Sequence, residues 1–270
     1  MTAKRPSMAP GWEKWNAHYR VQWRPIVDWL MRSAAVEAGM QVLDIACGVG
    51  QPAIPIADKV RPGGRVIGVD NDREMLAACR RLATIAGVDN LELREMDMHA
   101  LQFPDESFDA VTMSFALMFA KDPVRVMSEI RRVLRPGGRF ALAVWGAPAR
   151  NAFFTTMFDA LEALGPRPPV DPKAPGTFRL APHGELQSVI RAAGFQDFTV
   201  EALPVSFYSA SPEEHWQMVV DMAGPIATAV ETSPEAAAKV KAALLDKLAE
   251  HVVEGRVKLT ATPLCATAAR

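Results

Sequence analysis

The sequence predicts an α/β protein built on a doubly wound, Rossmann-like sheet of seven strands. Apolar, strand-like runs alternate along much of the chain with helix-compatible stretches such as 72–87 and 122–138. This alternation indicates a mostly parallel sheet with helices on both faces, because parallel neighbours are joined by crossovers that are usually helical. The strand-like runs are residues 42–46, 65–70, 91–97, 108–116 and 139–145.

Polar and glycine residues stand at or near the carboxyl ends of these runs. Right-handed crossovers bring those ends to one edge of the sheet, where open α/β sheets bind ligands. The sequence therefore predicts a ligand site at that edge. The residues concerned are Asp44, Gly48, Gly50, Asp70, Asp97 and Ser114.

The chain after Trp145 departs from this alternation. Residues 151–164 predict a helix, and residues 165–182 carry six prolines, which favour an extended segment. Residues 198–209 and 257–269 each predict one strand, and together they favour an antiparallel edge on the parallel sheet. Further helices are expected at residues 184–195, 212–224 and 234–253.

Four parts of the chain are expected. Apolar and aromatic residues from Trp12 to Leu30 recur at helical spacing, which predicts an amphipathic N-terminal helix that covers the ligand edge. The alternative is that this helix only packs on the sheet and that the proline-rich segment is a rigid connector. The parts are an N-terminal helical lid at 1–40, a ligand-binding core at 41–150, a proline-rich insertion or cap at 151–182, and a C-terminal part at 183–270 that completes the sheet and adds helices on the substrate side.

Composition excludes several function classes. The formal net charge of -1 gives no electrostatic reason to expect a nucleic acid or an anionic membrane surface as partner. No apolar run is long enough to span a bilayer, and the N-terminus lacks the apolar core of a signal peptide, so a cytoplasmic monomer or homodimer is expected. Cys47, Cys79 and Cys265 are too few and too scattered for a disulfide framework and are expected to be reduced thiols.

The loop GVGQPA, residues 48–53, matches the G-x-G-x-x-A form of a dinucleotide motif, and Asp44 precedes it within the strand. A nicotinamide or flavin cofactor would bring its pyrophosphate to this loop, where a nearby carboxylate in a low-dielectric site is unfavourable. S-adenosylmethionine reverses the sign, because it carries an ammonium and a sulfonium and has no phosphate. The carboxylate therefore favours S-adenosylmethionine.

Two further carboxylates extend this interpretation. Asp70 ends a strand twenty residues after Gly50, where a carboxylate can bind both hydroxyls of a ribose. Asp97 ends another strand and is followed by Met98, a pair suited to an adenine amino group and its apolar face. An isolated aspartate at a strand end is often only a helix cap or turn former, so the joint pattern carries the argument.

Four blocks together resemble the class I S-adenosylmethionine-dependent methyltransferases: VLDIACGVG, GVDND with Met75 following, MDMHALQFPDESFDAV and EIRRVLRPGGRFALAVW. Within that class the chain resembles the branch that includes the ubiquinone and menaquinone C-methyltransferases and small-molecule methyltransferases of secondary metabolism. The resemblance covers about residues 40–150. It departs from the usual D-x-G-x-G-x-G at one position, where Ala46 replaces the first glycine.

The resemblance implies roles for individual residues. Asp44 would bind the methionyl ammonium directly or through water, Asp70 the ribose, and Asp97 with Met98 the adenine edge. An aromatic N-terminal helix commonly folds over the cofactor in such families, which would bring Tyr19 close to it. The remaining cofactor contacts would come from Ala46, Cys47, Gly48, Gly50, Gln51, Asn71, Met75, Ser114 and Phe115.

The implied reaction is in-line displacement at the sulfonium methyl, with S-adenosylhomocysteine as product. It needs no metal, and the histidines show no metal-ligand spacing. A base is required only if the acceptor atom must lose a proton, as with a phenol or an activated carbon. The candidate bases are His18, Tyr19, His183 and His215, and none of them belongs to a recognised catalytic motif.

The expected acceptor is a small, largely hydrophobic molecule, methylated on carbon or oxygen and less readily on nitrogen. Two other function classes stay open. A non-methylating S-adenosylmethionine-binding protein, cyclase-like or regulatory, would keep the same cofactor blocks. A nicotinamide-dependent oxidoreductase is disfavoured by Asp44 and by the lack of a second mononucleotide-binding half. The residues expected to contact the acceptor are Met118, Trp145, Phe153, Phe154, Met157, Phe178, Trp216 and Met222.

Overall fold

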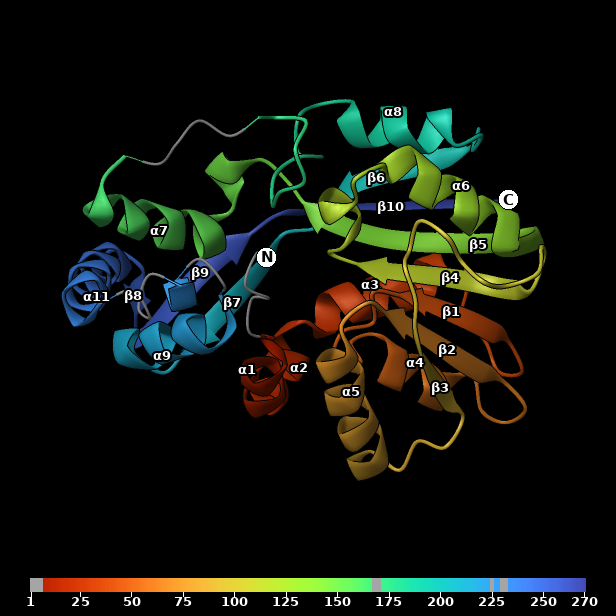
Figure 1. Ribbon diagram of the computed structural model, residues 1–270, viewed down its shortest axis with the longest axis horizontal. Coiled ribbons are helices and arrows are strands. Elements are labelled where there is room, and N and C mark those ends of the chain that lie inside the picture. Colours follow the sequence, from red (N-terminus) through yellow and green to blue (C-terminus); the bar gives the residue numbers. More distant parts are fainter. Residues whose placement is uncertain (1–6, 167–170, 224–225, 229–232) are drawn as a thin grey trace.

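A seven-stranded sheet forms the centre of the molecule (Figure 1). The computed structural model describes residues 7–166, 171–223, 226–228 and 233–270. The strand order is β3-β2-β1-β4-β5-β10-β6, in which only β10 runs antiparallel to its neighbours. This confirms the predicted fold class, with the antiparallel strand lying one place in from the edge. The strands are β1 Gln41–Ile45, β2 Arg65–Asp70, β3 Leu91–Glu95, β4 Phe108–Ser114, β5 Leu134–Trp145, β6 Phe198–Ala202 and β10 Pro263–Ala269.

Helices cover both faces of this sheet. The chain moves from β1 to β2 to β3 in one direction and from β4 to β5 in the other, so right-handed crossovers place the connecting helices on opposite faces. Asp72 and Asp122 begin two of these helices by accepting hydrogen bonds from backbone N–H groups of the first turn. The helices are α3 Arg24–Ser33, α4 Ala53–Lys59, α5 Arg73–Ile85, α6 Pro123–Val133 and α8 Glu185–Ala192.

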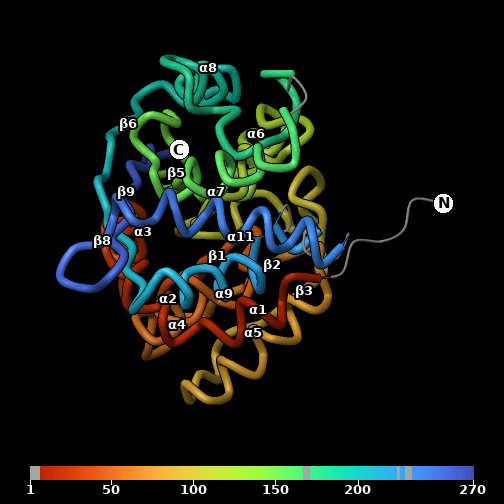
Figure 2. The backbone as a smooth tube through the Cα atoms, turned by 90° about the vertical axis from the view of Figure 1, so that its left-hand side faces the viewer, coloured from red at the N-terminus to blue at the C-terminus, as the bar shows by residue number. Residues whose placement is uncertain are grey.

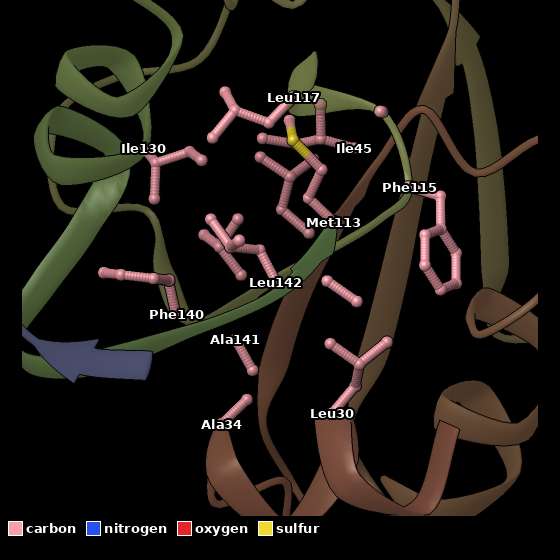
Figure 3. Close-up of a cluster of buried hydrophobic side chains, with 14 of the residues drawn as sticks. Leu30, Ala34, Ile45, Met113, Phe115, Leu117, Ile130, Phe140, Ala141 and Leu142 are labelled. Atoms are coloured by element: carbon pink, nitrogen blue, oxygen red, sulfur yellow. The ribbon is translucent and has the colours of Figure 1, made fainter. Parts of the chain in front are cut away.

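The main core lies between the sheet and these helices. Figure 3 shows Leu30 and Ala34 of α3 on one side of the strands and Ile130 of α6 on the other. Leu142 of the central strand β5 is fully buried because helices cover both faces of the sheet, and Leu30 is fully buried where α3 packs on one of them. The core therefore holds the strand ends of the ligand edge in fixed positions.

A second lobe packs beside the ligand edge. It has a three-stranded antiparallel sheet, ordered β7-β9-β8, and an apolar core of its own that includes Met157, Val219, Leu244 and Leu259. Figure 1 shows its helices and strands to one side of the main sheet. Its elements are α7 Ala152–Leu161, a 3-10 turn Glu162–Leu164, β7 Val205–Ser209, α9 Pro212–Met222, α11 Pro234–Ala249, β8 Val252–Val253 and β9 Arg256–Ala261.

This lobe corrects two sequence expectations. The single strands predicted at 198–209 and 257–269 are each two strands, one in each sheet. Pro204 and Pro263 stand at the junctions, and proline has no N–H to donate to a continuous ladder. The chain instead changes partners there, and Thr262 N donates to Asn151 Oδ1 at 3.1 Å.

Three element boundaries also differ from the sequence expectation. The N-terminal helix is three short helices, which meet at Trp15 and Trp23: α1 Ala9–Lys14, α2 Asn16–Gln22 and α3. β5 begins at Leu134, because Leu134 pairs with Phe108 across a bulge. The helix expected to reach residue 253 ends at Ala249, where the hairpin of β8 and β9 begins. In the proline-rich segment 165–182, residues 167–170 lie outside the described residues, and the described remainder has no helix or strand.

Candidate functional site

A cavity of about 490 Å³ lies at the carboxyl ends of β1, β4 and β5. The main sheet, the N-terminal helices and the second lobe all contribute to its walls. The wall residues are mostly aromatic or apolar, and none of them has a carboxylate, imidazole, ammonium or guanidinium group. They are Trp12, Asn16, Tyr19, Trp23, Ala46, Cys47, Gly48, Val49, Gln51, Met75, Ser114, Phe115, Phe119, Trp145, Phe153, Phe154, Met157, Phe158, Thr177, Val219, Met222 and Ala223.

The backbone turns sharply where β1 and β4 reach the cavity. Ala46 and Phe115 have φ angles of 55° and 54°, in the left-handed region that disfavours residues with a Cβ. Strained residues of this kind gather at ligand sites, where the surrounding structure fixes them. Both of them line the cavity.

The glycine loop leaves room beside its backbone. A Cβ built on Gly48 would meet nothing within 4 Å, whereas one on Gly50 would lie 2.6 Å from Ile54 and 2.9 Å from Cys79 Sγ. Gly48 and Cys47 line the cavity, and Gly50 holds the loop against the first turn of α4. The loop can therefore accept a ligand close to its main chain.

Asp44 is the most deeply buried charged group at this edge, with no exposed surface. Its Oδ1 accepts a hydrogen bond from Thr112 Oγ1 at 2.7 Å, and its Oδ2 has no partner among the described residues. Burial, with a smaller contribution from the nearby Asp70 charge, raises the pKa of Asp44 to about 7. The Ser114 hydroxyl, at the end of the neighbouring strand β4, is also buried and unpartnered in the described part of the chain.

Asp70 ties the glycine loop to the start of α5. Its Oδ2 accepts from Gly48 N at 2.9 Å, and its Oδ1 accepts from Asp72 N at 2.9 Å. Burial raises the pKa of Asp70. Asn71, the next residue, is exposed, and Met75 on the first turn of α5 lines the cavity.

Asp97 lies outside the cavity wall. Its side chain is 68% exposed, and its Oδ1 accepts from His99 N at 2.9 Å and contacts His99 Nδ1 at 2.6 Å. These contacts with His99 lower the pKa of Asp97. Met98 is half-buried and packs on the main core. The expected adenine contacts of this pair stay a prediction.

None of the candidate histidines lines the cavity. His18 Nε2 lies 2.9 Å from the carbonyl oxygen of Tyr208, and His183 is exposed. His215 is 2% exposed, its Nδ1 lies 3.0 Å from Ser209 Oγ, and burial lowers its pKa to about 4. The imidazole of His215 is therefore neutral at physiological pH.

Tyr19 is the candidate base that does line the cavity. It is 6% exposed, and burial raises its pKa well above the ordinary value. Its phenol group thus stays protonated and can donate a hydrogen bond but not accept a proton.

Aromatic rings form the wall beside the glycine loop. Phe115 and Trp145 stack with ring centroids 3.9 Å apart, and Trp23 meets Phe115 edge-on at 4.8 Å. Phe153 continues the wall at 6.2 Å from Trp145. Such a wall excludes water and presents flat apolar surfaces to a ligand.

Five of the eight residues expected to contact the acceptor line the cavity: Trp145, Phe153, Phe154, Met157 and Met222. The other three do not. Met118 is fully buried in the main core, Phe178 packs against Phe154 and Phe158, and Trp216 packs on the second core.

Several wall residues were absent from the predicted site. Phe158 follows Phe154 by one helical turn, and Val219 precedes Met222 on the same face of α9, so helical spacing offered a signal for both. Asn16 and Ala223 follow Trp12 and Val219 by four residues, so helical spacing offered a signal for them too, whereas Val49 and Thr177 carry none. Trp12 and Trp23 were predicted only as members of the N-terminal helical pattern.

Two properties of the described residues bear on other function classes. None of their helices is both long and apolar enough to cross a membrane. No cluster of three or more His, Cys, Asp or Glu side chains with the arrangement of a metal site occurs among them. The three cysteines are free and buried.

Solved structures share the fold that surrounds this cavity. The YcgJ protein of Bacillus subtilis is 22% identical, with a TM-score of 0.57 over 90% of this chain and 97% of that one. The [4+2]-cyclase SpnF is 21% identical, with a TM-score of 0.55 over 90% of this chain and 79% of its own. Phosphoethanolamine N-methyltransferase 2 of Haemonchus contortus, solved in complex with S-adenosyl-L-methionine, is 20% identical, with a TM-score of 0.55 over 91% of this chain and 52% of that one.

Residues 43–142 match the family model described as "Methyltransferase domain". Demethylmenaquinone methyltransferase of Listeria monocytogenes is 37% identical over 138 residues, which are 50% of this chain and 57% of that protein. The enzyme of the same name from Symbiobacterium thermophilum is 39% identical over 132 residues, 48% of this chain and 47% of the relative. The chain thus spans about half the length of these curated relatives, and the match confirms the resemblance found in the sequence.

Proposed function

We propose that the protein is an S-adenosylmethionine-dependent methyltransferase that acts on a small, largely hydrophobic acceptor. The observation that carries this proposal is the pair of buried polar atoms, Asp44 Oδ2 and Ser114 Oγ, that lack partners among the described residues beside an open glycine loop. A buried carboxylate oxygen without a donor costs free energy, which a cationic ligand would recover. The ammonium of S-adenosylmethionine is such a cation.

The described residues fit the other parts of this ligand. Asp70 is not itself a wall residue, but its carboxylate accepts from the N–H of the wall residue Gly48 and from Asp72 N, which fixes it beside the wall for ribose hydroxyls. Met75 offers an apolar contact on the adenine side, and Gly48 allows close approach of the ligand to the main chain. S-adenosylmethionine supplies a methyl group on a sulfonium, which is already an excellent leaving group.

The chain's own contribution is then to align the acceptor and exclude water. Orientation of two reactants can lower a barrier by about 7 to 11 kcal/mol. The stacked rings of Phe115 and Trp145 exclude water from the cavity, and the protonated phenol of Tyr19 can donate a hydrogen bond to an acceptor oxygen. These roles need no proton acceptor in the wall.

The acceptor class follows from the second half of the cavity. Phe153, Phe154, Met157, Val219 and Met222 form an apolar wall, which favours a neutral, hydrophobic molecule. The activity for which these relatives are named, demethylmenaquinone methyltransferase, supports an acceptor carbon in a quinone-like ring. The next acceptor atom that we propose is an oxygen on an aromatic or isoprenoid compound, and nitrogen ranks after it.

Calorimetric titration with S-adenosylmethionine, S-adenosylhomocysteine and NADH tests the proposal. We expect micromolar binding of the first two and none of NADH. Asp70→Ala should lose most of the affinity through unpaired ribose hydroxyls, while Asp89→Ala, an exposed carboxylate paired with Arg61, should keep it. Wild-type affinity in Asp70→Ala would refute the ribose assignment.

Transfer of a radiolabelled methyl group to extracts of the source organism tests the activity itself. A labelled small molecule that partitions into organic solvent is the expected product. Label in protein or RNA alone would overturn the acceptor class. Tight cofactor binding with no labelled product would instead identify a non-methylating S-adenosylmethionine-binding protein.

A further inference from the structure

One carboxylate of the second lobe receives three donors from two directions. Asp221 Oδ2 accepts from Lys14 Nζ and from Trp15 Nε1, both at 2.7 Å. Its Oδ1 accepts from Gln217 Nε2 at 3.0 Å, one turn earlier on α9. Burial raises the pKa of the Asp221 carboxyl, but these donors outweigh it and hold the pKa below its ordinary value. Asp221 therefore fastens the end of α1 to α9 as an anion.

The other side of α1 is fastened to the cofactor half. Glu13 accepts two hydrogen bonds from the Arg81 guanidinium of α5, at 2.7 and 2.6 Å. Just before α1, Ser7 Oγ donates to Asp72 Oδ2 at 2.8 Å. Asp72 also caps α5 and donates its N–H to Asp70. The proposed ribose carboxylate and the start of α1 are thus two hydrogen bonds apart.

Close packing accompanies these polar contacts. A Cβ on Gly11 would lie 1.9 Å from the carbonyl oxygen of Asp221, so only glycine lets α1 approach α9 this closely. Ala9 is 2% exposed and packs with Val49 of the glycine loop. Figures 1 and 2 show α1 between α5 and α9.

The two helices that α1 joins carry opposite parts of the cavity. Met75 on α5 lies on the cofactor side, whereas Val219 and Met222 on α9 belong to the acceptor wall. Asp221 lies between these two wall residues in the sequence. A shift of α1 relative to α9 would therefore move the acceptor wall against the cofactor.

We propose that Asp221 is a positioning residue that transmits cofactor binding to the acceptor wall through α1. The inference rests on the proposed function, because it needs a ligand at the glycine loop and Asp70. A ligand there restrains the motion of Asp70 and α5. Asp72 and Arg81 of this region bind the residues at and before α1, so α1 is restrained as well. Asp221 then restrains α9 through its contacts with Lys14 and Trp15. Coupling between sites is reciprocal, so an acceptor held by α9 also slows release of the cofactor product.

Hydrogen exchange with and without S-adenosylhomocysteine tests the relay. In the wild type, the ligand should slow exchange in α1 and in α9, each by about fivefold or more, the lower range of typical couplings. In Asp221→Asn, S-adenosylhomocysteine should still bind within about threefold of wild type and protect the glycine loop, but the slowing in α9 should be lost. Lys14→Met should weaken the slowing in α9 as well, and Lys14→Arg, which keeps the cation, should retain it.

The matched control is Glu106→Gln, which removes a carboxylate contact to Arg270 at 3.0 Å on the far side of the molecule and should leave the slowing intact. If Asp221→Asn does not fold, the relay is tested by comparing the ligand-dependent slowing of exchange in α9 between Lys14→Met and Lys14→Arg. Ligand-dependent protection of α9 that persists in both Asp221→Asn and Lys14→Met would overturn the relay alone. A wild type that does not bind S-adenosylhomocysteine would overturn the proposed function, and the relay with it.

Discussion

The two halves of the cavity differ in the chemical groups that they offer to a ligand. The sheet half presents buried polar atoms that lack partners among the described residues, such as Asp44 Oδ2 and Ser114 Oγ, together with strained backbone at Ala46 and Phe115. The lobe half, built from α7 and α9, presents methionine, valine and phenylalanine side chains on a small separate core. A half that recognises one charged ligand needs exact polar placement. A half that accepts an apolar molecule needs only shape, so its sequence has more freedom.

The largest expected effect comes from the two cores. Leu244→Ala empties a fully buried position in the second core, and Leu43→Ala does the same in the main core. Each should cost about 2–5 kcal/mol of local or global stability. Leu244→Ala should loosen α11 and α9 in hydrogen exchange while S-adenosylhomocysteine affinity stays within about tenfold. Equal loss of cofactor affinity in both variants would show that the halves unfold together.

The second effect is a pH dependence that belongs to the sheet half. Asp44 has a folded pKa of about 7 against 3.8 for an ordinary aspartate, so the native state binds more protons between these values. Its stabilising contribution is complete below pH 4 and is lost as pH rises through 7. Relative to Asp44→Asn, which keeps an acceptor for Thr112, the ligand-free wild type should lose up to about 1.4 kcal/mol per pH unit in that window. Urea unfolding of both proteins from pH 4 to 8 measures the difference, and parallel curves would contradict the assignment.

The same substitution should have the opposite effect on ligand binding. Asp44→Asn removes the charge that the ammonium requires, so S-adenosylmethionine affinity should fall by about 2–3 kcal/mol, roughly 30- to 150-fold. Wild-type affinity should itself weaken below pH 7, where Asp44 is protonated. Met222→Leu in the lobe half is the control, and calorimetry should find its cofactor affinity unchanged. A large loss in Met222→Leu would erase the distinction between the halves.

The smallest effect compares a strained residue of the cavity wall with a strained residue of the second lobe that lies away from the cavity. Ala46 and Glu254 have φ angles of 55° and 52°, and glycine relieves such strain at some cost in unfolded-state entropy. Ala46→Gly and Glu254→Gly should each stabilise the protein by about 0.5–1 kcal/mol in thermal unfolding. Only Ala46→Gly should alter cofactor affinity, because Glu254 lies in the β8–β9 turn away from the cavity wall.

The sheet half was predictable because its elements are local patterns. Apolar runs with helices between them indicate parallel strands, and Asp44 and Asp70 fall at strand ends wherever the boundaries lie within a residue or two. The second sheet was not predicted, because the apolar and β-branched residues of 198–209 indicate one strand, although Pro204 interrupts them at the junction. Only the pairing of Leu264 with Ala202 and of Ala261 with Val205 shows that the two sheets share these segments.

The individual site residues also differ in how far local sequence patterns could predict their contacts. Met222 was predicted to contact the acceptor and lines the cavity, yet Trp216 on the same helix faces the second core, because the side of α9 that meets the cavity depends on packing. Asp97 was expected to read an adenine edge, and in the structure its carboxylate contacts His99 within the following turn. Local hydrogen bonds of this kind compete with ligand contacts and are invisible in a motif.

Asn151 has a consequence for protein engineering. Its buried side chain donates to the carbonyl oxygens of Gly146 and Ala147 and accepts from Thr262 N. One amide therefore joins the end of β5 to Thr262, the residue between β9 of the second sheet and β10 of the main sheet. The lobe is therefore not a cassette inserted at one loop. The chain enters or leaves it between β5 and α7, α7 and α8, β6 and β7, and β9 and β10. A chimera that borrows another acceptor half must splice all of these junctions and keep Asn151 with its three partners.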